Sequence, residues 1–267
     1  MNKEKPIVSL KEKEEKVKDL RPIDDVLFEV LADDTEFCQE MLRLILEDDK
    51  LVVVDVIVQS SDRNLYGRSV RLDALCILSG GTKCNIEIQR SDNDDHLRRV
   101  RSNAASISVK DSQTSQKFAE IEDVIIVYIS QFDIFKSGHV LYHVDNVIRE
   151  TNEKVDDGLS RVFVNTEIKD GTTISEYMEC FLKKEINNPK FPILTKRMNL
   201  LKHEERGLNA VCDVMEKYEK KAVEENVNNF EKAIIMLNKG KTPEEIVLLG
   251  VPENLVERAV RLSEITK

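Results

Sequence analysis

The sequence has no tryptophan and few other aromatic residues, five tyrosines and nine phenylalanines among 267 residues. Proteins that bind single-stranded nucleic acid stack bases on aromatic side chains, so this composition disfavours a platform of that kind. The sequence also lacks an apolar run long enough to cross a membrane. Its N-terminal stretch is rich in lysine and glutamate and does not resemble a secretory signal. We therefore expect a cytoplasmic protein with no membrane partner.

Cysteine usage and net charge narrow the class of protein further. Five cysteines occur without any CxxC spacing, which argues against a structural zinc site. Their odd number and apolar surroundings fit reduced thiols in a cytosol. The chain has 50 acidic and 40 basic residues and a net charge of −10, which argues against a generally basic nucleic-acid-binding surface. Any contact with nucleic acid would need a local basic patch.

A β-hairpin over residues 71–90 is the feature around which we interpret the rest of the chain. Two β-rich runs flank the turn residues Ser79-Gly80-Gly81, a pattern typical of a hairpin. Side chains alternate between the two faces of a strand, so the second run places Asn85, Glu87 and Gln89 on one face and apolar residues on the other. Such a polar face, opposite a strand that carries Asp73, calls for a functional explanation.

The loop length decides whether Asp73 faces Glu87. A two-residue turn would pair Ala74 with Glu87, whereas a three-residue loop pairs Asp73 with Glu87 directly. We favour the three-residue loop, or a bulge of the same parity, because Gly80 and Gly81 can adopt the left-handed conformation that it needs. Opposed Cβ atoms then lie about 5 Å apart. Two carboxylates that close repel each other unless a cation lies between them, and their oxygen ligands suit Mg²⁺ or Mn²⁺.

The flanking sequence predicts an α/β domain with a mixed sheet. Helices are expected from Pro22, from Thr35 and from about His96. The β-branched run at residues 51–58 predicts a buried strand, and further strands are expected at residues 67–78, 124–130, 139–144 and 161–166. The resulting element order is α-β-β-β-α-β.

Outside this domain we expect a charged tail at residues 1–20 and a helical region at residues 201–267, which leaves residues 21–200 for the domain itself. Gly250 separates two short helices near the C-terminus, as in a helix-turn-helix. Basic residues are not concentrated in the second helix, so a small packing element is the alternative interpretation.

Asp73 followed fourteen residues later by Glu87-x-Gln89 resembles the active-site pattern of the PD-(D/E)XK nuclease superfamily. A longer series of motifs, from about Arg21 to about Lys202, is similar to its recombination-promoting nuclease and transposase family. The motifs that carry this closer resemblance are Arg21-Pro22-Ile23-Asp24-Asp25 with Phe28, Gly67 to Asp73, Asn85 to Gln89, Arg98 to Arg101, and Asp156 to Leu159 with Val164-Asn165-Thr166.

The resemblance implies a restriction-endonuclease-like core and a Mg²⁺- or Mn²⁺-dependent DNA endonuclease, with Asp73, Glu87 and Gln89 as catalytic residues. Asp73, Glu87 and Asp25 would bind the metal. Asp24 and Asp25 could instead only cap a helix and offset its dipole. The family's lysine position is Gln89 here, which cannot take a proton at neutral pH, so we expect it to position the attacking water.

The resemblance also places an arginine-rich helix after the catalytic strand. Arg98, Arg99 and Arg101 are its nucleic-acid-binding candidates, since arginine suits bidentate contact with phosphate. A salt-bridged surface helix is the alternative, and Ser102 stands where the family often has an aromatic residue. Arg68 and Arg71 could approach a phosphate or simply be solvated. His96 is interpreted as a helix-start residue, with proton transfer as the alternative.

Three hypotheses for function remain open. The first is a metal-dependent DNA endonuclease, and the second is a non-catalytic nucleic-acid-binding or interaction protein on a degenerate nuclease fold. The third is an unrelated acidic scaffold in which Asp73 and Glu87 are surface charges. Carboxylates that meet beside the arginine-rich helix would favour the first two. Many nucleases of the resembled superfamily act as dimers, so a homodimer is an expectation from resemblance alone.

Overall fold

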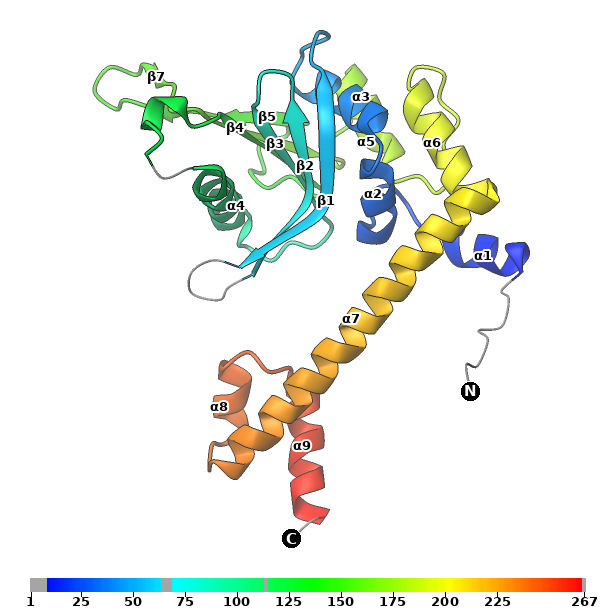
Figure 1. The fold of residues 1–267 in the computed structure, drawn as a ribbon, viewed down its shortest axis with the longest axis vertical. Coiled ribbons are helices and arrows are strands. Elements are labelled where there is room, and N and C mark those ends of the chain that lie inside the picture. Colours follow the sequence, from blue (N-terminus) through cyan, green and yellow to red (C-terminus); the bar gives the residue numbers. More distant parts are fainter. Residues whose placement is uncertain (1–8, 64–68, 113–114, 266–267) are drawn as a thin grey trace. The chain divides into compact units, whose positions relative to one another are not determined.

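A computed structural model describes residues 9–63, 69–112 and 115–265 (Figure 1). The chain divides into two compact units, Met1–Cys212 and Asp213–Lys267. The first unit contains a six-stranded sheet with helices on both faces, and the second is helical. Within the described residues, no helix is both long and apolar enough to cross a bilayer.

The sheet is mixed and has the strand order β1-β2-β3-β4-β8-β5. Its central pairs, β3 with β4 and β4 with β8, are parallel, while the outer pairs are antiparallel. The predicted α-β-β-β-α-β core with a mixed sheet and C-terminal helices is therefore confirmed. The strands are β1 (Val53–Arg63), β2 (Ser69–Leu78), β3 (Lys83–Gln89), β4 (Val124–Ser130), β5 (Leu141–Val144) and β8 (Leu159–Asn165), with a separate ribbon of β6 (Asn146–Val147) and β7 (Lys154–Val155).

Several helices begin at residues whose side chains satisfy free backbone N–H groups. Asp34 accepts from the N–H of Phe37 at the start of α3, and Ser9 and Glu12 form a capping box at the start of α1. The helices are α1 (Leu10–Val17), α2 (Asp25–Ala32), α3 (Thr35–Ile45), α4 (His96–Asp111), α5 (Thr173–Cys180), α6 (Pro192–His203), α7 (Glu205–Asn238), α8 (Pro243–Leu248) and α9 (Glu253–Ile265), with a short 3₁₀ turn at Phe118–Glu120.

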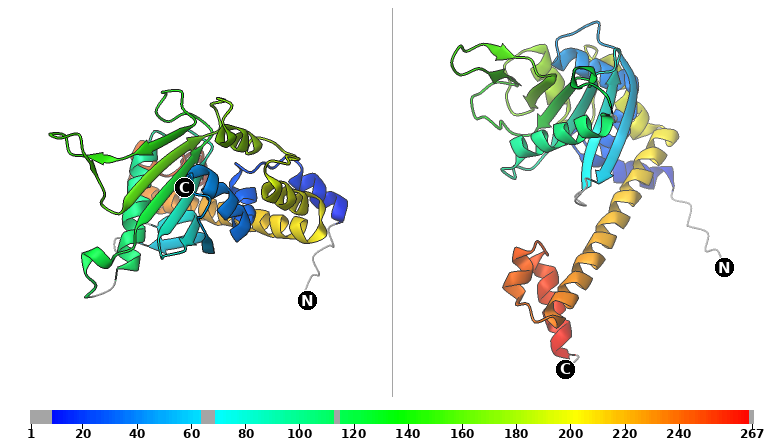
Figure 2. Two further views of the ribbon diagram at one scale, coloured as in Figure 1. Left: turned by 90° about the horizontal axis from the view of Figure 1, so that it is seen from above. Right: turned by 60° about the vertical axis from the view of Figure 1, so that its left-hand side comes forward.

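Helix α4 covers one face of the sheet, and α2, α3 and α5 lie on the other (Figures 1 and 2). Val100, Ala104 and Ile107 recur at helical spacing along α4 and are buried in one cluster. The sheet residues of that cluster include Tyr128 and Phe163. The face that bears Asn85, Glu87 and Gln89 is therefore the face beneath α4.

The prediction that residues 51–58 form a buried strand is wrong. The run does form most of β1, but β1 is an edge strand that, among the described strands, pairs with β2 alone. Val52, Val54 and Ile57 are exposed, Val54 by 62%. A run of β-branched residues predicts a strand, but its place in the sheet depends on distant partners.

The hairpin between β2 and β3 has the predicted three-residue loop. Cys76 pairs with Cys84 and Ile77 with Lys83, which leaves Ser79-Gly80-Gly81 as the loop. Gly80 and Gly81 both have φ near +100°, a conformation that glycine adopts without strain. The predicted strand start at Gly67 and the neighbouring Arg68 lie outside the described residues.

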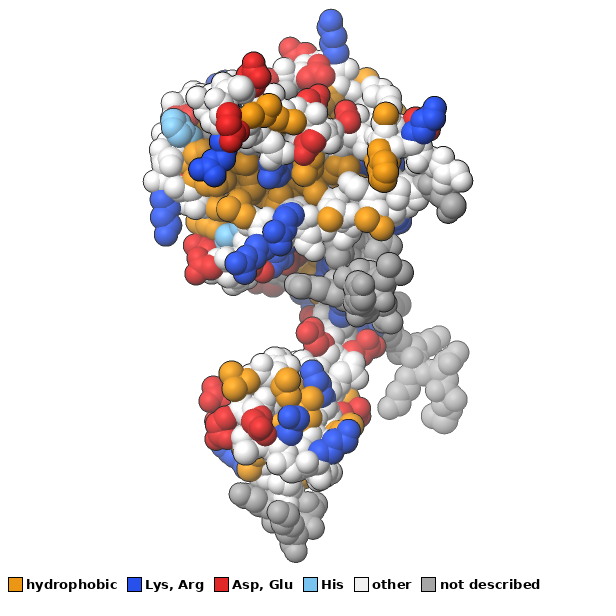
Figure 3. All heavy atoms as spheres, turned by 90° about the vertical axis from the view of Figure 1, so that its left-hand side faces the viewer, with side chains coloured by type: hydrophobic (Ala, Val, Ile, Leu, Met, Phe, Trp, Pro, Cys, Tyr) orange, Lys and Arg blue, Asp and Glu red, His pale blue; other side chains and the backbone are white. Residues whose placement is uncertain are grey.

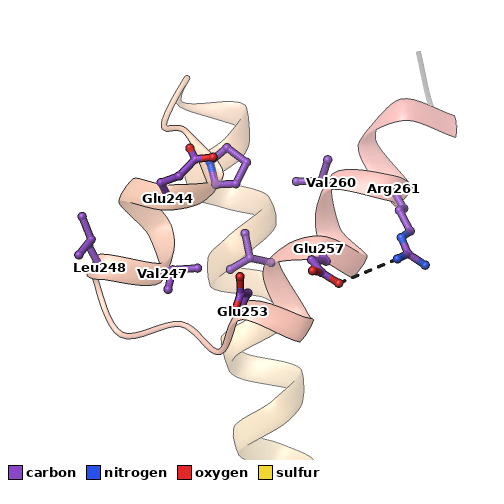
Figure 4. Close-up of a pocket in the computed structure, with 9 residues that line it drawn as sticks. Glu244, Val247, Leu248, Glu253, Glu257, Val260 and Arg261 are labelled. Atoms are coloured by element: carbon purple, nitrogen blue, oxygen red, sulfur yellow. Dashed lines mark ion pairs between the residues drawn. The ribbon is translucent and has the colours of Figure 1, made fainter.

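In the second unit, the C-terminal part of α7 packs with α8 and α9 around buried Ala233, Ile246 and Val256. A groove of about 660 Å³ on α8 and α9 has apolar residues, including Val247 and Val260, and an acidic rim (Figure 4). The acidic residues are Glu244, Glu253 and Glu257. Arg261 also lines the groove and pairs with Glu257, so basic residues do not dominate its lining, and the small packing element stays our interpretation of these helices.

Candidate active site

The strands β2 and β3 stop pairing where their acidic residues meet. Their regular register ends at Ala74 opposite Ile86, and the next step places Asp73 opposite Glu87. Beyond this point side chains replace the ladder: the Ile88 N–H donates to Oδ2 of Asp73 at 3.0 Å, and the Asp73 N–H reaches Oε1 of Glu87 at 3.4 Å. The two carboxylates therefore lie together where the sheet opens, as the three-residue loop predicts.

Burial disfavours the charged form of both carboxyls. Glu87 is only 4% exposed, and burial together with the charge of Asp73 raises its pKa to about 8. Burial, with a contribution from Asp25, raises the pKa of Asp73 to about 6. Asn85 opposes the upward shift in the pKa of Glu87, because its Nδ2 donates a hydrogen bond to Oε1 of Glu87 at 2.9 Å. The buried Glu87 and the half-buried Asp73 thus form a pair of neighbouring acids that a cation would stabilise.

Asp25 begins α2 and lies close enough to Asp73 for its charge to raise the pKa of that residue. The preceding residue, Asp24, stands at the N-cap of α2, but its side chain makes no capping hydrogen bond. The capping alternative therefore does not describe Asp24. Asp24 instead pairs with Arg21 and, at 2.7 Å, with Arg90 just after β3. This ion pair ties the start of α2 to the end of β3 and so brings Asp25 to the acidic pair.

Gln89 lies two residues beyond Glu87 and on the same face of β3. Its Nε2 donates to the backbone oxygen of Ser91 at 2.8 Å, so the amide nitrogen is engaged by the loop that follows the strand. The amide oxygen is thereby the end of the side chain that can serve as an acceptor.

The three arginines of α4 have different environments. Arg98 and Arg101 are exposed, whereas the Arg99 side chain is 38% exposed and its Nη2 lies 3.5 Å from Asp95. The charge of Arg99 lowers the pKa of both Asp73 and Glu87, which places it near the acidic pair. On the face drawn in Figure 3, lysine and arginine side chains lie among acidic and apolar ones and form no continuous basic surface.

Sequence reasoning assigned no role to Asn85, Tyr128 or Asp92. Asn85 could have been found from the period-two pattern, which puts it beside Glu87. Tyr128 stands opposite Glu87 in the parallel register of β3 and β4, and no local signal in the sequence predicts that neighbour. Asp92 contacts His96, which is the first residue of α4, as predicted, and is also buried.

The acidic pair fits a divalent metal ion. Within the described ranges, no group of three or more His, Cys, Asp or Glu side chains is arranged as a ready metal site. However, Asp73 and Glu87 offer hard oxygen ligands, and Oδ1 of the fully buried Asn85 has no hydrogen-bond partner among the described residues. Oxygen ligands of this kind suit Mg²⁺ and Mn²⁺.

A mixed sheet of α-β-β-β-α-β order, with paired acids where two strands diverge, is the architecture of a restriction-endonuclease-like nuclease core. The chain belongs to the family of PD-(D/E)XK nuclease family transposases, which it matches over residues 27–239. That segment contains Asp73, Glu87, Gln89 and the arginines of α4, and it begins two residues after Asp25. No curated protein and no solved structure matches the chain. Family membership implies a nuclease that acts on DNA, and PD-(D/E)XK nucleases typically use divalent metals.

Proposed function

We propose that this protein is a divalent-metal-dependent DNA endonuclease of the recombination-promoting type, which hydrolyses phosphodiester bonds. The observation that carries this proposal is the meeting of Asp73 and Glu87, from neighbouring strands, at the point where β2 and β3 separate. Two neighbouring acids, one buried and one half-buried, whose pKa values are both raised are costly to the fold when they are charged. Such perturbed pairs concentrate at functional sites.

In this proposal Asp73 and Glu87 hold Mg²⁺ or Mn²⁺, with Asp25 as the third acidic residue. When bound, the metal supplies a Lewis acid that lowers the pKa of a water molecule and offsets negative charge at the phosphate. Asn85 keeps the Glu87 carboxylate oriented through its 2.9 Å hydrogen bond. Gln89, whose Nε2 is bound to Ser91, uses its amide oxygen to hold the attacking water.

The arginines divide into two roles. Arg99 lies beside the acidic pair and contacts the phosphate that is cleaved. Arg98 and Arg101, exposed on α4, contact neighbouring phosphates without reading the base sequence. Because such contacts release counterions, DNA binding weakens as salt concentration rises.

The test is cleavage of supercoiled plasmid with Mg²⁺ or Mn²⁺, with and without EDTA. We expect metal-dependent nicking by the wild-type protein and by Asp49→Asn, a change at an exposed acidic residue. Asp73→Asn and Glu87→Gln should abolish nicking. Nicking that persists in Asp73→Asn would refute the proposed site.

A non-catalytic DNA-binding protein on the same fold is the second candidate. The observation that favours it is Gln89, which stands at the family's lysine position with its amide nitrogen bound to the loop. This candidate predicts salt-dependent DNA binding by the wild-type protein and no cleavage with either metal. Wild-type cleavage that is lost in Asp73→Asn would exclude it.

A further inference from the structure

The groove between α8 and α9 presents apolar side chains to solvent (Figure 4). Val247 of α8 and Val260 of α9 point toward one another across it. Leu248, the last residue of α8, also lines the groove and is 86% exposed. Contiguous apolar surface of this kind typically marks a place where another molecule binds.

The two helices that form the groove are held firmly in place. A capping box of Thr242 and Glu245, with Pro243 at the first helical position, fixes the start of α8. Ile246 of α8 and Ala259 of α9 are fully buried in one core with the C-terminal part of α7. The groove is therefore a preformed surface, which lowers the cost of ordering side chains when a partner binds.

Negative charge surrounds the apolar lining. Glu244 of α8 and Glu253 of α9 line the groove and form no ion pair within the described part of the chain. Glu257 lies 3.9 Å from Arg261, and because both side chains are exposed, this ion pair is weak. Residues 243–265 contain five glutamates, two arginines and no lysine. The rim of the groove is therefore acidic on balance, with two carboxylates free to pair with a cation.

Apolar lining and acidic rim together select among the molecules that could cover the groove. A second copy docked face to face would bring the glutamates of two rims together, which costs free energy. Nucleic acid shares the negative charge of the rim and lacks aliphatic side chains to fill the space between Val247 and Val260. A helix with an apolar row and flanking cations satisfies both features, because such helices bind in grooves through their apolar face.

We propose that the groove between α8 and α9 is a docking site for an amphipathic helix of a basic partner protein. Leucine or isoleucine side chains, spaced i, i+3 or i+4, and i+7 on that helix, enter between Val247 and Val260 and cover Leu248. Lysine or arginine side chains beside this apolar row pair with Glu244 and Glu253. The docking site belongs to the second unit alone and does not rest on the proposed nuclease function.

The test measures fluorescence anisotropy of a labelled peptide titrated with the full-length protein. The probe is an amphipathic peptide of leucine and lysine, about 18 residues long so that it can form a helix by itself. A peptide with the same leucines and with glutamate in place of lysine tests the role of charge. We expect the leucine-lysine peptide to bind at least about tenfold more tightly than the leucine-glutamate peptide, and less tightly as salt concentration rises.

Variants of the groove separate specific docking from general attraction to an acidic chain. Leu248→Gln removes apolar contact without changing the charge, and since Leu248 is 86% exposed, the fold does not depend on it. This variant should bind the leucine-lysine peptide about tenfold more weakly. Glu253→Gln should weaken binding about threefold, because it removes one exposed ion pair with the peptide. Val223→Gln and Glu225→Gln make the same changes at exposed positions of α7 and should bind as the wild-type protein does.

Three results would overturn the docking site. Equal affinities of the two peptides, or equal losses in the groove variants and their matched controls, would mean that the chain attracts cations without using the groove. Wild-type affinity in Leu248→Gln would show that the apolar lining makes no contact with the peptide. If analytical ultracentrifugation finds a dimer of the wild-type protein and a monomer of Leu248→Gln, a second copy covers the groove and the basic partner is wrong.

Discussion

Replacing Glu87 by Gln should stabilise the metal-free protein at neutral and alkaline pH. Glu87 titrates at about pH 8 in the folded protein, against 4.5 ordinarily. A carboxyl whose folded pKa is raised favours folding at low pH, and this contribution is lost as pH rises through the folded value. Each tenfold difference in proton affinity corresponds to 1.36 kcal/mol, so the wild-type protein should lose about 3 kcal/mol of unfolding free energy from Glu87 between pH 5 and pH 8.

Glu87→Gln removes the pH-dependent loss of unfolding free energy that Glu87 causes. It keeps the hydrogen bond from Asn85, because the Gln oxygen can accept it. Asp73, with a pKa of about 6, leaves a residual loss on the order of 1 kcal/mol over the same range. Saturating Mg²⁺ should restore stability to the wild-type protein at pH 8, because a ligand that binds only the folded state stabilises it.

Urea unfolding in EDTA, followed by circular dichroism from pH 5 to pH 8.5, measures these differences. Glu150→Gln, a change at an exposed glutamate, is the control and should follow the wild-type curve. The reasoning is refuted if the wild-type unfolding free energy does not fall with pH, or if it falls as steeply in Glu87→Gln.

Three further predictions concern metal binding, DNA binding and the N-terminal helix. Asp24→Asn should weaken Mg²⁺ binding severalfold by calorimetry, since it breaks the ion pairs with Arg21 and Arg90 beside the proposed ligand Asp25; unchanged affinity would contradict a role for these ion pairs in metal binding. Arg98→Gln and Arg101→Gln should each reduce the slope of log K against log salt by about 1 in mobility-shift titrations, while Arg99→Gln should mainly lower the cleavage rate. Lys202→Met should cost about 2 kcal/mol in urea unfolding, because Nζ of this buried lysine donates to the backbone oxygens of Val17, Lys18 and Leu20. A cost near zero would mean that α1 contributes little to stability.

The hairpin and its acidic pair follow from local rules. Side-chain alternation along β3 and the parity of the Ser79-Gly80-Gly81 loop are enough to place Asp73 opposite Glu87. Both rules act over a few residues, which is why the sequence favoured the three-residue loop over the two-residue turn that the structure excludes. The edge position of β1 could not be predicted in this way, because it depends on which distant strands pair, and among the described residues β1 pairs with β2 alone.

The same division applies to the arginines of α4. Helical spacing makes Arg98, Arg99 and Arg101 project in different directions around the axis of α4. The sequence alone does not say which of these side chains points toward Asp73 and Glu87. Packing of Val100 and Ala104 against the sheet sets the rotation of the helix. That rotation leaves Arg98 and Arg101 in solvent and brings Arg99 close enough to Asp73 and Glu87 for its charge to lower the pKa of both.

By itself, the sequence determined the strand-loop-strand unit, the α-β-β-β-α-β order and the acidic pair, because turn chemistry and side-chain periodicity are properties of neighbouring residues. Only the tertiary structure decided what surrounds that pair. Arg90 reaches Asp24 and Tyr128 lies beside Glu87 through strand pairing and helix packing between segments far apart in the chain. The link from Asp92 through His96 to Tyr128 forms because α4 lies across β4, and contacts of that range leave no periodic trace in the sequence.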